Sequence, residues 1–239
     1  YRPTATGRLA LSMASAYTGP MAIVRNIPAN VSAQAAALLE RAYALDGDAA
    51  SRALYRDWAE TYDDTMLQGL GYRSPAVVAR MLGEHLADRQ ALVLDIGCGT
   101  GLAGHKLGEL GFVAIDGLDL SPEMMQVAAR RNVYRNFITA DLNRPLPMRD
   151  GSYAGASCSG TFTHGHVDAR CLDEVFRILQ RGAPFSFTVK LEVWEPLGFK
   201  AMLAQLQADG RIAEVVTTHD RHYESSQLPD GVFCVYRRL

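Results

Sequence analysis

The chain has 239 residues, of which 48% are hydrophobic and 21% are charged, a balance typical of a folded globular protein with a sizeable core. Its formal net charge of -2, without a long basic run, gives no electrostatic reason to expect a nucleic-acid partner. No stretch approaches the length of a membrane span, and the four widely spaced cysteines form no C-x-x-C pair. We therefore expect a cytoplasmic protein with reduced thiols, no metal site and no membrane partner.

The first part of the chain differs in composition from the rest. Residues 1–30 are rich in Ala, Ser, Thr, Gly and Pro without a sustained period, which predicts irregular structure. From Ser32 onward apolar residues recur at helical spacing on both sides of an Asp-Gly-Asp turn, which predicts a helical hairpin. We predict an N-terminal extension over residues 1–50 and a main domain over 51–239. The main domain is expected to begin with lid helices at 51–73.

Strand and helix patterns alternate through the main domain. Ser74 as N-cap with Pro75 at the first helical position predicts a helix start, and Ser121 with Pro122 predicts another. The segment LVLDIGCGTGLAG at 92–104 is typical of a strand, a turn and a helix. Six further strand patterns are FVAIDGLDLS, NFITAD, SYAGASCSG, PFSFTVK, RIAEVVTT and VFCVYRR, the last two expected to pair antiparallel at an edge. These patterns predict an α/β fold: a Rossmann-like, doubly wound, mostly parallel seven-stranded sheet with an antiparallel edge strand and an N-terminal helical extension.

Three glycines, Gly97, Gly99 and Gly101, follow the first strand. Glycine is needed where the backbone takes a positive φ or approaches a ligand closely, and the helix N-terminus beyond the turn points unpaired amides at the same place. A nucleotide-like cofactor is therefore expected there. Gly99, Gly101 and Gly104 also satisfy the G-x-G-x-x-G pattern, with Asp119 downstream, so an NAD site remains an alternative.

The residue at the strand end, Asp95, favours a different cofactor. A carboxylate beside the loop repels a pyrophosphate, whereas it suits a cofactor that carries a sulfonium and an ammonium group. In agreement, the motifs DIGCGTG, LDLSPEMM and ADLNRPLP occur in an order and spacing that resemble the class I S-adenosylmethionine-dependent methyltransferases.

A closer resemblance covers roughly residues 50–239. The segments YRDWAETYDD, GYRSP and the stretch ending in THGHV are similar to the methyltransferase-like proteins of the Williams-Beuren region and their bacterial relatives. The resemblance implies S-adenosylmethionine as cofactor and S-adenosylhomocysteine as product. It also implies a cofactor half over 74–160 and a substrate half over 161–239.

The same resemblance assigns roles to individual residues. It implies that Asp119 accepts hydrogen bonds from both ribose hydroxyls, a bidentate role that a carboxylate fills well. It implies further that the glycine loop presents its backbone to the methionyl and ribose parts and that Tyr62 closes over the methionyl end. The residues expected to bind the cofactor, including Asp95 and Arg73 from the charge arguments, are Tyr62, Arg73, Asp95, Gly97, Cys98, Gly99, Thr100, Gly101, Asp119, Leu120, Met124, Asp141, Leu142 and Cys158.

The adenine end has its own implied contacts. Leu120 and Met124 would flank the ring, Asp141 would accept from the adenine amino group, and the Leu142 amide would serve a ring nitrogen. Cys158 would lie beneath the cofactor, after the fourth strand.

Several of these residues also have purely structural explanations. Asp119 can cap the following helix beside Ser121, and Asp141 can belong to a polar turn. Arg73 suits the methionyl carboxylate because a guanidinium binds carboxylates bidentately, but it also suits a solvated loop. Cys98 is expected to contribute only its amide.

Methyl transfer from a sulfonium is an in-line displacement, so positioning and water exclusion matter more than a strong base. If the acceptor loses a proton, His164 and His166 in THGHV are the nearest candidates for taking it. The alternatives are that His166 stabilises the next helix and that His164 is a solvated loop residue.

The favoured function is a methyltransferase acting on an oxygen or nitrogen atom of a small molecule, with no nucleic acid expected. The alternatives are a protein or RNA methyltransferase and a non-catalytic cofactor-binding module. Trp194 and Phe199 suggest a partly apolar substrate pocket, with burial in the core as the competing explanation. The sequence does not indicate the oligomeric state.

Overall fold

The computed structural model describes residues 61–163 and 167–239 of the chain. The predicted N-terminal extension over 1–50 and most of the helical hairpin lie outside the described residues. The two candidate proton acceptors, His164 and His166, lie outside them as well.

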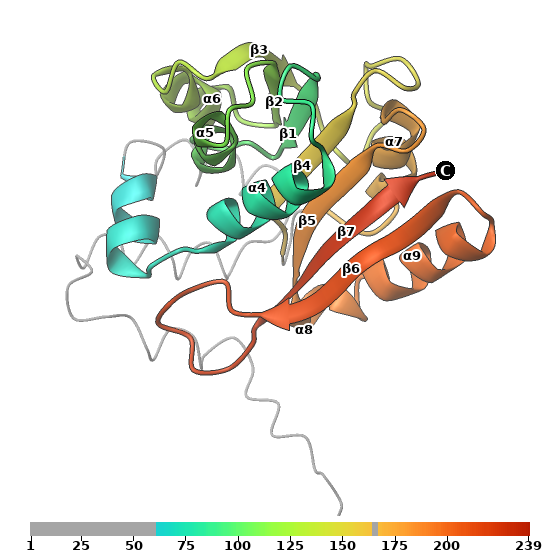
Figure 1. Ribbon diagram of the computed structural model, residues 1–239. Helices are drawn as coiled ribbons and strands as arrows, with labels where there is room; N and C mark the ends of the chain where they lie inside the picture. Colours follow the sequence, from blue (N-terminus) through green and yellow to red (C-terminus); the bar gives the residue numbers. More distant parts are fainter. Residues whose placement is uncertain (1–60, 164–166) are drawn as a thin grey trace, which may run out of the picture.

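Seven strands form a single sheet in the order β3-β2-β1-β4-β5-β7-β6 (Figure 1). The pairs from β3 to β5 are parallel, while β7 runs antiparallel to both β5 and β6. The predicted doubly wound, mostly parallel sheet with an antiparallel pairing at its edge is therefore confirmed. The strands are β1 (Val93–Ile96), β2 (Ile115–Asp119), β3 (Tyr134–Thr139), β4 (Gly155–Phe162), β5 (Pro184–Lys190), β6 (Ile212–Asp220) and β7 (Gly231–Arg238).

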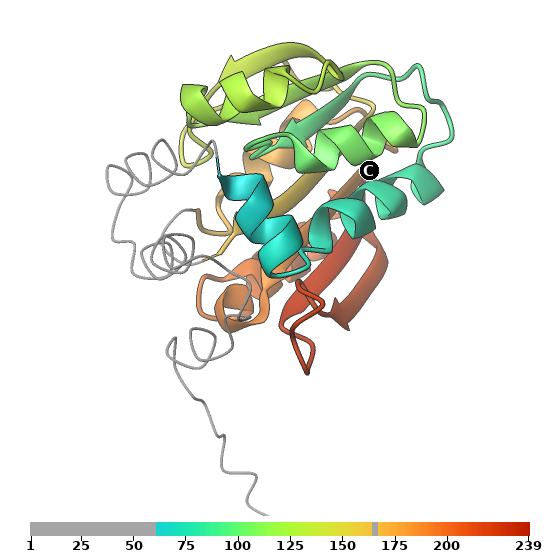
Figure 2. The same ribbon diagram turned by 90° about the vertical axis from the view of Figure 1, so that its left-hand side faces the viewer.

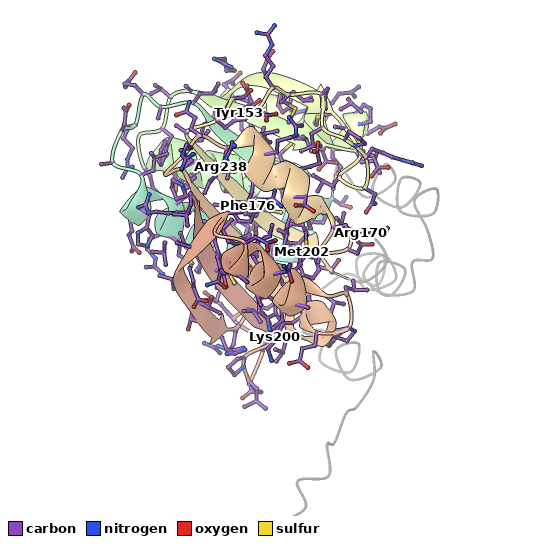
Figure 3. The ribbon with its side chains drawn as sticks, turned by 90° about the vertical axis from the view of Figure 1, so that its right-hand side faces the viewer. Tyr153, Arg170, Phe176, Lys200, Met202 and Arg238 are labelled. Atoms are coloured by element: carbon purple, nitrogen blue, oxygen red, sulfur yellow. The ribbon has the colours of Figure 1, made fainter. Side chains whose placement is uncertain are left out.

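Helices cover both faces of the sheet (Figures 1 and 2). One face carries α4, α5 and α6, and Figure 3 looks onto the other, with Phe176 on α7 and Met202 on α9. A short π-helix, η1, precedes α4 and faces the viewer in Figure 2. The helices are η1 (Asp64–Gly69), α4 (Ser74–His85), α5 (Leu102–Glu109), α6 (Pro122–Ala129), α7 (Cys171–Ile178), α8 (Leu191–Trp194) and α9 (Phe199–Ala208).

The two faces bury separate apolar clusters. Leu82 of α4, Val93 of β1 and Leu107 of α5 are completely buried together on one face. The larger cluster on the other face is built around phenylalanines. The rings of Phe162 and Phe199 have centroids 4.9 Å apart. Since β5 is buried at every position, as expected for a strand covered on both sides, the sheet provides a rigid platform for residues at its strand ends.

The start of α4 differs from the prediction. The helix includes Ser74, and Arg73 occupies the N-cap position without a side-chain hydrogen bond. The Ser74 hydroxyl instead lies 2.6 Å from Nδ1 of the buried His222, so a tertiary contact replaces the expected cap. At α6 the prediction is confirmed, because the Ser121 hydroxyl accepts from the Met124 amide at 3.2 Å.

The four cysteines are free and buried. Burial raises the pKa of Cys158 to about 12 and that of Cys98 well above its usual value, so both thiols stay protonated at neutral pH. None of the helices in the described ranges has the length and apolar content needed to cross a membrane.

Candidate cofactor site

A cavity lies at the carboxyl ends of β1, β2 and β4, where doubly wound sheets bind ligands. It is lined by backbone from the glycine loop, by acidic and apolar residues after β2 and β3, and by the end of β4. The lining residues are Tyr62, Gly97, Gly99, Leu118, Asp119, Leu120, Ser121, Met124, Ala140, Asp141, Leu142, Asn143, Ser159, Gly160, Thr161 and Val167.

The glycine loop brings bare backbone to this cavity. Gly97 and Gly99 have φ values of 62° and 52°, which L side chains rarely adopt. A Cβ on Gly97 would lie 1.9 Å from the Thr161 hydroxyl, whereas a Cβ on Gly99 would meet nothing within 4 Å. The backbone at Gly99 therefore borders open space at the wall of the cavity.

Asp119, at the end of β2, is the main acidic residue of the cavity. Its carboxylate accepts from the amides of Gly99 and Ser121, both at 2.8 Å. Burial raises its pKa above the ordinary value, although the backbone donors counteract part of that effect. The remaining lone pairs are available to hydroxyl donors of a ligand, so the capping and binding explanations of this residue are compatible.

The residues expected at the adenine end also come together. Leu120, Met124, Asp141 and Leu142 all line the cavity. Asp141 accepts from the Asn143 amide at 2.8 Å, which makes it part of a local turn as well as a lining residue. The sequence did not single out Asn143, although its position directly after ADL marks the same strand end.

A smaller recess adjoins the cavity and shares Tyr62, Gly97, Gly99 and Ser159 with it. The predicted residues Cys98 and Thr100 line this recess. Tyr72, which the sequence reasoning missed although it lies in GYRSP, lines it as well. The Tyr72 hydroxyl is 3.2 Å from the Ser159 hydroxyl, at the place where the two hollows meet.

Asp95 has a different role from the one predicted. The residue is 1% exposed and does not line the cavity. Its carboxylate accepts from the Tyr134 hydroxyl at 2.7 Å, the Ser157 hydroxyl at 3.0 Å and the Gly104 amide at 3.0 Å. Because α5 has glycine at its N-cap, Asp95 satisfies an amide of the first helical turn from the neighbouring strand. Burial raises its pKa to about 6.

Other predicted residues also lie away from the cavity. The Arg73 guanidinium pairs with Asp220 at 3.2 Å instead of facing the recess. Cys158 is completely buried inside β4, because this strand continues to Phe162 instead of ending before the cysteine. Gly101 is absent from both linings, and Phe199 belongs to the core.

The chemistry of the lining fits a nucleoside joined to an amino acid. Carboxylates at Asp119 and Asp141 suit hydroxyl and amino donors, and Leu120, Met124 and Leu142 supply apolar contact. None of the described residues around the cavity or the recess is lysine or arginine. A dinucleotide would bring its pyrophosphate to the N-terminus of α5, where the Gly104 amide already donates to the Asp95 carboxylate, so the NAD alternative is disfavoured.

Comparison with known proteins agrees with this geometry. Residues 93–182 match the family model described as a methyltransferase domain. The chain is 32% identical to human methyltransferase-like protein 27 over 124 residues, which are 51% of this chain and 50% of the relative. It is 38% identical to the bovine 18S rRNA (guanine-N(7))-methyltransferase over 66 residues, 28% of this chain and 23% of the relative. The chain therefore spans half or less of the length of these curated relatives.

A solved structure supports the fold. A methyltransferase in complex with the Trm112 methyltransferase activator of Haloferax volcanii superposes with a TM-score of 0.59, covering 77% of this chain and 97% of the other. At 20% identity this likeness concerns the fold alone. Residues 93–182 are therefore similar to a methyltransferase domain, and the chain has the fold of a solved methyltransferase.

Proposed function

We propose that this protein transfers the methyl group of S-adenosylmethionine to an oxygen or nitrogen atom of a small molecule. The observation that carries the proposal is the lining of one continuous site. Asp119 and Asp141 offer acceptors for a nucleoside, while Tyr62 and Ser159 border both the cavity and the recess beside it. The residues that the cavity and the recess share place the recess beside the cavity, at the end of β4.

The residues of the chain act mainly by positioning. When bound, S-adenosylmethionine supplies an already activated methyl group, so the protein must hold the acceptor in line and keep water out. Asp119 and the Gly99 backbone would fix the ribose side, and the apolar residues Leu120, Met124 and Leu142 would hold the adenine. Tyr62 would cover the methionyl end.

The acceptor is expected near the hydroxyls of Tyr72 and Ser159, which lie 3.2 Å apart at the junction of the two hollows. Hydroxyls there can hydrogen-bond an acceptor oxygen or nitrogen and orient its lone pair. His164 and His166 follow the end of β4 in sequence and remain the predicted proton acceptors.

The size of the substrate is the point on which two hypotheses differ. The lining of the described site has no cationic side chain to hold a phosphate backbone, which favours a small, neutral acceptor. RNA remains the second candidate, because several relatives of the chain, the bovine protein among them, are named as 18S rRNA methyltransferases. The absence of a nucleic-acid partner therefore stays a prediction.

The test is to incubate the purified protein with methyl-labelled S-adenosylmethionine and cell extract, and to separate the products by size. Label in the low-molecular-weight fraction supports the proposal. Label in RNase-sensitive or protease-sensitive material would assign the function to RNA or protein instead. S-adenosylhomocysteine binding by calorimetry, with no label transferred to any fraction, would identify a non-catalytic binding module.

A further inference from the structure

Three segments that are distant in sequence meet beside the glycine loop: the start of the η1 region, the loop itself and the end of α6. The Thr100 hydroxyl donates to Asp63 Oδ1 at 2.6 Å. Arg131 forms an ion pair with the other carboxylate oxygen of Asp63, and its Nε donates to the Thr100 carbonyl at 2.7 Å. We infer that Asp63, Thr100 and Arg131 form a latch that holds Tyr62 against the cofactor site, with Arg131 as the positioning residue.

The arrangement has the features of a specific contact. The side chains of Arg131 and Asp63 are 18% and 31% exposed, so solvent screens the pair less than a surface ion pair. The Arg131 guanidinium contacts both the Asp63 carboxylate and the Thr100 carbonyl, and these two contacts fix its orientation. A lysine ammonium, which lacks the planar fork of donors, would not be oriented in this way.

Gly101 explains why the loop accommodates this arginine. It does not line the cavity, and a Cβ on it would lie 3.0 Å from Cδ of Arg131. Its φ of 86° also disfavours a side chain. The third glycine of the motif therefore makes room for Arg131 together with Tyr134 and Ala128, whereas Gly97 and Gly99 border the cavity.

The consequence for binding follows from the position of Tyr62. This residue directly precedes Asp63 and lines both the cavity and the recess. Holding Asp63 on the glycine loop therefore holds one wall of the site in place. The inference rests on the proposed function: with a cofactor bound, the latch must open before the cofactor leaves, so its strength sets the dissociation rate.

The test measures S-adenosylhomocysteine dissociation by stopped flow for the wild type and for Arg131→Ala, Arg131→Lys and Asp63→Asn. Because a hydrogen-bonded charge pair is lost, we expect dissociation about tenfold faster for Arg131→Ala and Asp63→Asn. Arg131→Lys keeps the positive charge, so its dissociation rate should lie between those of these two variants and that of the wild type. S-adenosylhomocysteine should dissociate from the double variant, which combines Arg131→Ala with Asp63→Asn, no faster than from the faster of the two single variants. The reason is that both substitutions disrupt the same latch. Arg80→Ala, which removes the exposed Arg80–Glu84 pair on α4, is the matched control.

Hydrogen exchange separates failure of the latch from failure of the proposed function. In the ligand-free protein, Arg131→Ala should speed amide exchange at 61–70 and leave β1, β4 and β5 protected. Unchanged exchange, or dissociation rates within twofold of the wild type, would overturn the latch. A wild-type protein that does not bind S-adenosylhomocysteine, together with faster exchange in the variant, would overturn the cofactor assignment and leave the latch standing.

Discussion

At the residue scale, two aspartates of the motif region have different surroundings. Asp95 lies within β1 and Asp119 ends β2, and both accept backbone amides. Asp119 lines the cavity, while Asp95 faces Tyr134 and Ser157 inside the protein. The sequence predicted the first placement and missed the second, because charge and position along a strand do not reveal which face of the sheet a side chain joins.

Replacing Asp119 tests its binding role. In Asp119→Asn the amide nitrogen would face one of two backbone donors, Gly99 or Ser121, and the charged acceptor for ribose would be lost. We expect S-adenosylhomocysteine to bind more weakly by about 2 kcal/mol, roughly thirtyfold, in isothermal titration calorimetry. Asp88→Asn, in an exposed turn, is the control and should bind as the wild type does. An affinity of Asp119→Asn within twofold of the wild type would contradict the assignment.

The raised pKa of Asp95 predicts how the stability of the protein changes with pH. This pKa is about 6 in the folded protein against an ordinary 3.8, so the folded state holds its proton more tightly than the unfolded state does. The contribution of this group to stability is therefore fully present below about pH 4 and is lost as the pH rises through 6. Relative to Asp95→Asn, the free energy of unfolding of the wild type should fall by about 2 kcal/mol between pH 4 and pH 7. Urea titrations at several pH values measure this difference, and a constant difference would refute the interpretation.

At the element scale, most helices and strands were predictable because apolar periodicity and Gly or Pro punctuation are local signals. The glycine loop, the α6 cap at Ser121 and all seven strands follow from them. The insertion of β7 between β5 and β6 was not predictable from such signals, since strand order depends on contacts between distant segments. The same holds for Ser74, whose hydroxyl pairs with His222, 148 residues further along the chain.

The contact between Ser74 and His222 joins α4 to the loop between β6 and β7. The variant Ser74→Ala tests how much this contact contributes to stability. His222 is completely buried, and burial lowers its pKa to about 3, so the ring is neutral. Its Nε2 has no hydrogen-bond partner within the described residues, and losing Ser74 would remove the side-chain partner of Nδ1 as well. We expect the free energy of unfolding to fall by about 2 kcal/mol in urea titrations. Ser152→Ala, at an exposed turn, should change it by less than about 0.5 kcal/mol.

At the scale of the whole molecule, the candidate site depends on the sheet bringing distant segments together. Residues of the η1 region, of the loops after β1, β2 and β3, and of the end of β4 meet at one edge. Sequence motifs predicted the acidic and glycine residues of this site because each follows a recognisable strand. They did not predict Tyr72 or Arg131, which follow η1 and α6 and depend on how those helices pack, or Ser159, which lies near the end of β4.

Because the site is built from so many segments, a cofactor that binds it should stabilise the entire fold. A ligand at one hundred times its dissociation constant adds about 2.7 kcal/mol to the free energy of unfolding. For a chain of this size we expect S-adenosylhomocysteine at that excess to raise the melting temperature by about 5 to 10 °C in differential scanning fluorimetry. Asp119→Asn at the same ligand concentration should show a much smaller rise. NAD should leave the melting temperature unchanged, because the Gly104 amide at the N-terminus of α5, where its pyrophosphate would bind, already donates to Asp95. A comparable rise with NAD would instead restore the dinucleotide interpretation of Gly99, Gly101 and Gly104.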